Sequence, residues 1–168
     1  MKSLVVFFTR SDNTKVLAKM IADAAEGELE EVKETGISRR GLTGYLRAAK
    51  SSWKKESAEI AEVKQNPADF DVIFVGTPVW AWKVSPAIRS YLSRFKLGGK
   101  PVAFFCTMAG GGDDRAFDLM KELTPDSKLM GTFSVRSQEL GHREALRSRV
   151  EEWIEDVKRK LAGGSSQE

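Results

Sequence analysis

The 168-residue sequence predicts an α/β domain, built on a doubly wound five-stranded parallel sheet with helices on both faces. Short apolar runs alternate along the chain with amphipathic helical patterns, which is typical of successive strand–helix units. Three of the runs are continuously apolar, as expected for parallel strands that are covered on both faces. The length fits a single domain, which we assign to residues 1–162, followed by a disordered tail over residues 163–168.

Five strands are expected, and a helical segment follows each of them. In chain order they cover Ser3–Thr9, a weaker strand around Glu28–Lys33, Asp71–Thr77, Pro101–Thr107 and Lys128–Val135. Right-handed crossovers bring the carboxyl ends of parallel strands to one edge of the sheet, where ligands bind at the point of reversed strand order. The loops after the first, third and fourth strands are therefore the candidate functional segments.

Cap residues mark where three of the helices begin. The first helix begins near Asp12–Asn13 and stops at Gly27, a residue type common at helix ends. Ser85, with a proline directly after it, is expected to cap the helix of "PAIRSYLSRF". Asp113 or Asp114 is expected to cap the helix of "DRAFDLMKEL".

Apolar stripes at helical spacing identify the inward faces of two further helices, one in a basic segment and one near the C-terminus. The first stripe consists of Leu42, Tyr45, Leu46, Ala49 and Trp53, and the second of Leu146, Val150, Trp153, Val157 and Leu161. Trp53 and Trp153 are therefore predicted to be core residues rather than ligand contacts.

Composition argues against several classes of protein. Cys106 is the only cysteine and His142 the only histidine, so neither an internal disulfide nor a metal site is expected. The apolar run around Cys106 predicts a buried thiol, whereas His142 is expected in solvent. No apolar run approaches the ~20 residues of a membrane span, and the N-terminal run is too short for a signal peptide. These features indicate a cytoplasmic protein.

The net charge of +3 is mild, and basic residues gather between Arg39 and Lys55. A solvated helix face is the main interpretation of this segment, and a docking surface for an acidic partner stays open. Binding of nucleic acid is not expected, because no nucleic-acid motif accompanies the charge.

The loop after the first strand, "TRSDNT", leads directly into a helix and has the chemistry of a phosphate site. The hydroxyls of Thr9, Ser11 and Thr14 and the amide of Asn13 can donate hydrogen bonds to a phosphate. The first N–H groups of the following helix lack intrahelical partners, and the helix dipole favours an anion there.

The loops after the third and fourth strands are aromatic and glycine-rich. "GTPVWAWKVSP" carries Trp80 and Trp82, and "TMAGGGDD" carries the glycines Gly110–Gly112. The glycines match neither a dinucleotide fingerprint nor a Walker A loop. Indole faces stack on planar rings, so the three loops together fit a flat aromatic ligand with a single phosphate.

With these three motifs the sequence resembles the flavodoxin family, especially its short flavodoxin-like branch, over nearly the whole chain to about Leu161. The resemblance implies a flavodoxin-like fold and a noncovalently bound FMN. Trp80 is the first candidate for the stacking residue and Trp82 the second. The implied cofactor-binding residues are Thr9, Arg10, Ser11, Asp12, Asn13 and Thr14 in the first loop, Pro78, Val79, Trp80, Ala81 and Trp82 in the second, and Thr107, Met108, Ala109, Gly110, Gly111 and Gly112 in the third.

Two residue patterns depart from the family. Asp12 stands where the phosphate loop usually has glycine, and a carboxylate there must turn away from a phosphate or act as the helix cap. The segment from Val79 to Val84 contains no glycine, although flavodoxins commonly have one beside flavin N5.

The resemblance implies an FMN-dependent electron carrier that works with redox partner proteins. The alternative on the same fold is an NAD(P)H-dependent quinone or FMN reductase, for which basic residues such as Arg10, Lys83 and Arg115 could bind a nucleotide phosphate. A signalling receiver domain is rejected, because it needs acidic residues at the ends of the first and third strands, where this chain has Phe7–Thr9 and Gly76–Thr77.

Overall fold

The computed structural model describes residues 1–35 and 57–164. The helix predicted around Leu42–Trp53 and the basic segment from Arg39 to Lys55 lie outside the described residues. The described strands are β1 (Ser3–Phe7), β2 (Glu28–Glu31), β3 (Val72–Pro78), β4 (Pro101–Met108) and β5 (Lys128–Arg136). The helices are α1 (Asn13–Ala25), α3 (Pro86–Phe95), α4 (Asp113–Leu123) and α5 (Arg143–Gly164), with 3-10 turns η1 (Pro67–Asp69) and η2 (Ser137–Gly141).

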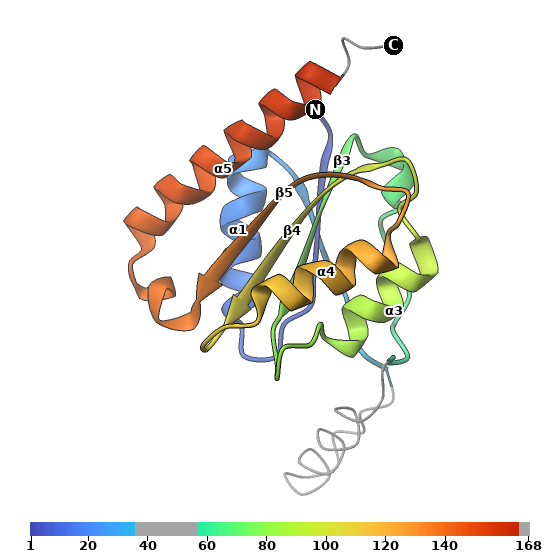
Figure 1. Cartoon of the computed structure of the whole chain (residues 1–168), viewed down its shortest axis with the longest axis horizontal. Helices are drawn as coiled ribbons and strands as arrows, with labels where there is room; N and C mark the ends of the chain where they lie inside the picture. The colour runs from blue at the N-terminus through green and yellow to red at the C-terminus, as the bar shows by residue number, and fades with distance from the viewer. Residues whose placement is uncertain (36–56, 165–168) are drawn as a thin grey trace, which may run out of the picture.

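The five strands form one parallel sheet in the order β2-β1-β3-β4-β5 (Figure 1). The chain moves outward from β1 to β2 and then returns to β3 on the other side of β1. Strand order therefore reverses between β1 and β3, which is where sheets of this kind bind ligands. The predicted fold class is confirmed, and all five predicted strands are found within two residues of their expected ends.

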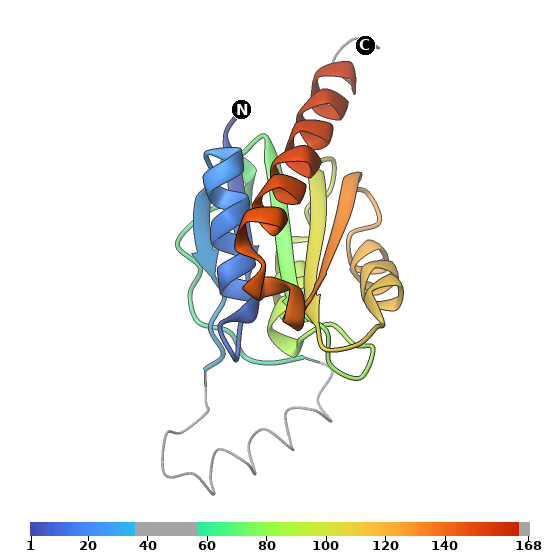
Figure 2. The ribbon, with the colours of Figure 1, turned by 90° about the vertical axis from the view of Figure 1, so that its left-hand side faces the viewer.

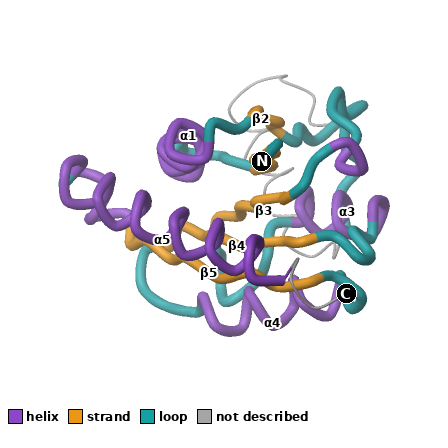
Figure 3. Tube along the Cα trace, turned by 90° about the horizontal axis from the view of Figure 1, so that it is seen from above, coloured by secondary structure: helices purple, strands orange, loops and turns teal. Residues whose placement is uncertain are grey.

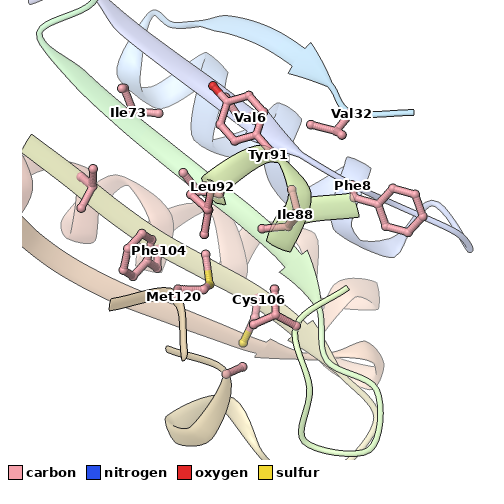
Figure 4. Close-up of a cluster of buried hydrophobic side chains, with 14 of the residues drawn as sticks. Val6, Phe8, Val32, Ile73, Ile88, Tyr91, Leu92, Phe104, Cys106 and Met120 are labelled. Carbon is pink, nitrogen blue, oxygen red and sulfur yellow. The ribbon is translucent and has the colours of Figure 1, made fainter. Parts of the chain in front are cut away.

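Helices cover both faces of the sheet. α1 and α5 pack on one face, and α3 and α4 on the other, which Figures 2 and 3 show from two further directions. Alternate residues of a strand point to opposite faces. In β1, Leu4 and Val6 therefore pack toward α3 and α4, whereas Val5 and Phe7 pack toward α1 and α5. Figure 4 shows the buried hydrophobic cluster on the α3 and α4 face, into which Tyr91 of α3 points.

Gly76 leaves room within the sheet for the ring of Phe105. It lies in β3 beside Phe105 of β4, and a Cβ added at Gly76 would overlap the Phe105 ring. Phe105 is fully buried. The Phe105 ring therefore occupies space that a side chain at position 76 would fill.

The predicted cap of α3 is confirmed, whereas the predicted cap of α4 is wrong. Ser85 is the N-cap of α3, and its Oγ accepts a hydrogen bond from the N–H of Ile88 at 3.4 Å. The expectation that Asp113 or Asp114 caps α4 is wrong, because the N-cap is Gly112, at φ 103°. Both aspartates lie instead in the first turn of α4, where negative charge interacts favourably with the helix dipole.

The structure confirms several predictions for single residues. Cys106 is fully buried, and burial, with a smaller contribution from Asp113, raises the pKa of its thiol. His142 is exposed. Trp153 of α5 stacks on Phe133 with ring centroids 5.1 Å apart, so it belongs to the core.

Near the C-terminus, α5 continues through Gly163 and Gly164, the first residues of the predicted tail, and residues 165–168 lie outside the described part of the chain. Within residues 1–35 and 57–164, no helix is both long and apolar enough to cross a membrane.

Candidate functional site

The three candidate loops meet at the carboxyl end of the sheet, at the lower end of the strands in Figure 1. Residues 8–12 connect β1 to α1, residues 79–85 connect β3 to α3, and residues 109–112 connect β4 to α4. We call them the phosphate loop, the tryptophan loop and the glycine loop. Because β1, β3 and β4 are adjacent and parallel, the three loops are neighbours.

The backbone conformation at Asp12 is one that glycine adopts more easily than other residues. Its backbone has φ 62° and ψ −4°, in the left-handed region that L side chains adopt at a cost and that aspartate tolerates better than most. Asp12 is the N-cap of α1, but its side chain makes no capping hydrogen bond. The carboxylate is exposed. From the sequence, this carboxylate was expected either to turn away from a phosphate or to cap the helix. Asp12 takes the cap position, but its side chain does not make the usual capping hydrogen bond.

The phosphate loop keeps donors available for an anion. The Thr9 Oγ1 atom is buried and has no hydrogen-bond partner among the described residues, which is unusual for a hydroxyl. Ser11 is exposed. The N–H groups of the first turn of α1 have no preceding helical carbonyl to bond. An unsatisfied buried hydroxyl beside a helix N-terminus is the arrangement that a phosphate group would complete.

Two of the predicted phosphate donors, Asn13 and Thr14, also make hydrogen bonds to other segments of the site. The hydroxyls of Thr14 and Thr107 are 2.8 Å apart and buried. The Asn13 amide donates to Ser137 Oγ at 3.2 Å, and Ser137 Oγ donates to the carbonyl of Met108 at 3.1 Å. These bonds fasten the start of α1 to the end of β4.

Ser137 is not among the predicted site residues, because it lies in η2, after the fifth strand, and the candidate loops follow the first, third and fourth strands. The η2 turn is held by Glu139, whose carboxylate accepts from the Arg136 N–H at 2.7 Å and pairs with Arg149 at 2.6 Å. These two contacts lower the pKa of Glu139.

The tip of the tryptophan loop is a two-residue turn that contains no glycine. Trp80 and Lys83 exchange backbone hydrogen bonds of 3.2 and 2.9 Å. Between them, Ala81 and Trp82 have φ values of 46° and 61°. Two central residues with positive φ define the I′ type of hairpin turn, which strongly favours Asn-Gly or Gly-Gly. The missing glycine of this loop therefore leaves Ala81 and Trp82 in a strained backbone conformation.

Substituting glycine at Ala81 tests this strain. Ala81→Gly should raise the free energy of unfolding by about 0.5–1 kcal/mol, because the relief of left-handed strain exceeds the extra chain entropy that glycine loses on folding. Urea denaturation measures the change. The matched control is Ala109→Gly in the glycine loop, which is exposed and lacks positive φ, and which should lower stability instead. Equal changes in both variants would show that the turn is unstrained.

The two tryptophans of this loop differ in their surroundings. Trp80 is half-buried, with the Phe8 ring edge-on at 6.0 Å and the Arg10 guanidinium 4.6 Å from its ring centroid. Trp82 has 61% of its surface exposed. Trp80 thus joins the tryptophan loop to the phosphate loop, while Trp82 presents its indole to solvent.

The glycine loop touches the tryptophan loop. A Cβ added at Gly112 would overlap the Trp82 ring and lie 3.1 Å from the Trp82 Cα, and the φ of 103° also requires glycine. Ala109, Gly110 and Gly111 are exposed, with open space around the two glycines. Gly112 is therefore needed for packing, whereas Gly110 and Gly111 leave room beside the loop.

Backbone and side-chain hydrogen bonds hold the base of the tryptophan loop. The Val79 N–H donates to the carbonyl of Thr107 at 2.8 Å. At the other end of the loop, the Ser85 N–H donates to Thr77 Oγ1 at 3.0 Å. Thr77 and Ser85 are both fully buried. Pro78, the last residue of β3, is buried between these contacts.

Arg10 contacts the Trp80 ring and is also close enough to Glu34 to affect its charge. Burial raises the pKa of Glu34, and the positive charge of Arg10 partly opposes this. Glu34 forms a short antiparallel bridge with Ile60. Within the described ranges, no group of three or more histidine, cysteine or acidic side chains could hold a metal ion.

A five-stranded sheet in this order defines a doubly wound α/β protein. The polar, aromatic and glycine-rich loops at its switch point form a candidate ligand site at the carboxyl end of the sheet. The family model described as Flavodoxin matches residues 2–157, and the chain belongs to the flavodoxin family. The family predicted from the sequence is therefore confirmed. Among curated proteins, no sequence matches this chain.

Solved structures show the same fold. A flavoprotein in complex with FMN from Lactobacillus acidophilus NCFM is 24% identical, with a TM-score of 0.66 over 85% of this chain and 98% of that chain. A flavodoxin from Streptococcus pneumoniae TIGR4 is 14% identical, with a TM-score of 0.60 over 95% and 99%. The two-electron reduced flavodoxin of Megasphaera elsdenii is 16% identical, with a TM-score of 0.55 over 91% and 98%. The family and the FMN of the Lactobacillus protein support the cofactor predicted here.

Proposed function

We propose that this protein binds FMN noncovalently and transfers electrons between redox partner proteins. The observation that carries the proposal is the meeting of three loops at the switch point of a flavodoxin sheet. One loop offers donors for a phosphate, one carries two indoles, and one is glycine-rich. FMN supplies the redox chemistry when bound, since its ring takes up electrons reversibly.

The chain's own residues have separate tasks in this proposal. Thr9, Ser11, Asn13 and Thr14 bind the phosphate together with the first N–H groups of α1. The unpartnered Thr9 hydroxyl gains the hydrogen bond that it lacks. Trp80, with Trp82 second, stacks on the ring, and the glycine loop forms the opposite side. The Asp12 carboxylate, exposed at the N-cap, is the group that disfavours an anion at this loop.

Cofactor content tests the proposal directly. Protein purified without added flavin, or titrated with FMN at micromolar concentration, should quench flavin fluorescence with a one-to-one end point, because indoles beside the ring quench it. Flavin released by heat should be FMN. A colourless protein that leaves the fluorescence of added FMN unchanged would show that the flavin assignment is wrong.

The second candidate function is an NAD(P)H-dependent quinone or FMN reductase. Lys83 in the tryptophan loop and Arg115 in the first turn of α4 are exposed and supply positive charge for a nucleotide phosphate. Mixing the FMN-loaded protein with NADPH under argon distinguishes the electron carrier from the reductase. A carrier should leave the visible absorbance of the flavin unchanged over minutes. Rapid bleaching would identify the reductase.

A further inference from the structure

Ser137 links the start of α1 to the end of β4, although it belongs to neither element. It lies in η2, after β5, and is half-buried. Its Oγ donates a hydrogen bond to the carbonyl of Met108, the last residue of β4, at 3.1 Å. Because a backbone carbonyl can only accept, this bond uses the single hydrogen of the Ser137 hydroxyl. Toward any other group, the hydroxyl can therefore act only as an acceptor.

The other partner of Ser137 is the side-chain amide of Asn13, the first residue of α1. The Asn13 Nδ2 atom donates to Ser137 Oγ at 3.2 Å. If the amide were turned by half a rotation, its Oδ1 atom would meet a hydroxyl that has no hydrogen left to give, so the bond to Met108 determines which end of the amide faces Ser137. An amide nitrogen carries two N–H groups. Among the described residues the structure shows a partner for one of them, and the second is available to an anion.

The η2 turn holds Ser137 in place through contacts of its own. Leu140 of η2 is buried in the apolar cluster that α1 and α5 form on the sheet. The Glu139 carboxylate accepts the N–H of Arg136 at 2.7 Å and pairs with Arg149 of α5. These contacts do not involve the Ser137 side chain. Replacing Ser137 should therefore remove its two hydrogen bonds and leave the turn in place.

We propose that Ser137 is a positioning residue for recognition of the flavin phosphate, because it orients the Asn13 amide so that the second N–H of this amide donates to the phosphate. The inference rests on the proposed binding of FMN. Asn13 contacts the phosphate together with the first N–H groups of α1, whereas Ser137 acts through Asn13. Recognition of the phosphate thus extends to a residue 124 positions away from Asn13 in the sequence.

The affinities of FMN and of riboflavin, which lacks the phosphate, test the role of Ser137. Ser137→Ala should bind FMN about fivefold more weakly, within the range for loss of one hydrogen bond. Its affinity for riboflavin should change little, because the Asn13 amide has no phosphate to bind there. Ser137→Thr keeps the hydroxyl and should bind FMN with an affinity close to that of the wild type. Titration followed by flavin fluorescence measures each affinity.

A double-mutant cycle with Asn13 shows whether Ser137 acts through that residue. Asn13→Ala removes the proposed donor and should weaken FMN binding at least as much as Ser137→Ala does. In the Asn13→Ala background, Ser137→Ala should cause no further loss, because the group through which it acts is gone.

Ser127→Ala is the matched control. The Ser127 Oγ also donates to a backbone carbonyl, that of Thr124 at 2.8 Å, but Ser127 directly precedes β5, at the opposite end of the sheet from the site. This variant should leave the ratio of FMN affinity to riboflavin affinity unchanged. Urea midpoints of all the variants report folding independently of flavin.

Three results would overturn the inference. If Ser137→Ala leaves the ratio of FMN affinity to riboflavin affinity unchanged, whatever its urea midpoint, Ser137 has no part in recognition of the phosphate. If its loss of FMN affinity persists in the Asn13→Ala background, it does not act through Asn13. If Ser137→Thr loses as much affinity as Ser137→Ala, the hydroxyl is not responsible. A wild-type protein that binds neither flavin would instead refute the proposed function, and the inference with it.

Discussion

Replacing Gly76 with alanine is expected to lower the free energy of unfolding by about 3 kcal/mol, at the upper end for overpacked cores. The added methyl group would overlap the ring of Phe105, which is fully buried in the cluster that the sheet forms with α1 and α5. Neither the ring nor the sheet backbone can move away without disturbing its neighbours, since protein interiors are packed to crystal density. Urea denaturation followed by circular dichroism measures the loss.

The matched control for this variant is Gly110→Ala. Nothing lies within 4 Å of a Cβ at Gly110, and its φ is not positive, so stability should change by less than about 0.5 kcal/mol. In a Gly76→Ala background, Phe105→Leu should recover part of the loss by making space. A Gly76→Ala protein as stable as wild type would mean that the sheet is looser at β3 and β4 than the structure shows.

Replacing Trp80 with alanine is expected to weaken FMN binding by about tenfold or more. The variant removes the first candidate for stacking on the flavin ring, and aromatic stacking contributes roughly 0.5–1.5 kcal/mol beyond the area buried. It also removes the contacts of Trp80 with Phe8 and Arg10, which link the tryptophan loop to the phosphate loop. Both losses act in the same direction. Titration of the variant with FMN, followed by flavin fluorescence, measures the effect.

Three further variants serve as comparisons for Trp80→Ala. Trp80→Phe keeps an aromatic ring and should retain most of the affinity. Trp82→Ala removes the 61% exposed indole and should cost less than Trp80→Ala. Trp53→Ala, at a residue outside the described part of the chain, should also cost less. A larger loss for Trp82→Ala than for Trp80→Ala would assign the stacking role to Trp82.

The fold could be predicted from the sequence because its determinants are local. The continuously apolar runs around Val5, Phe74 and Phe104 can be buried on both faces only in a covered parallel sheet, and all three residues are fully buried. Ser85 and its following proline give a cap signal that needs no tertiary contact. The α4 cap was predicted wrongly because a glycine in a run of three looks like part of a flexible turn. In the structure, Gly112 is needed for its positive φ and for the space that Trp82 occupies.

The composition of the candidate site was predictable, but its internal bonding was not. The sequence places hydroxyls in the phosphate loop, yet only the packing of α1 against β4 shows that Thr14 bonds to Thr107. Ser137 joins the site through two hydrogen bonds that span 124 and 29 positions of sequence. No local pattern encodes contacts at such separation. Likewise, the lack of glycine in the tryptophan loop was visible, but the strain at Ala81 and Trp82 depends on the turn that the loop forms.

Cys106 gives the protein a practical property. It is the only cysteine of the chain, it is fully buried, and its raised pKa keeps the thiol protonated, so the folded protein offers thiol reagents no reactive group. A cysteine introduced at any exposed position, such as Ala109 beside the glycine loop, would therefore be the one site of chemical attachment. A spin label or fluorophore placed there could follow ligand binding at single-residue precision without first removing a native thiol.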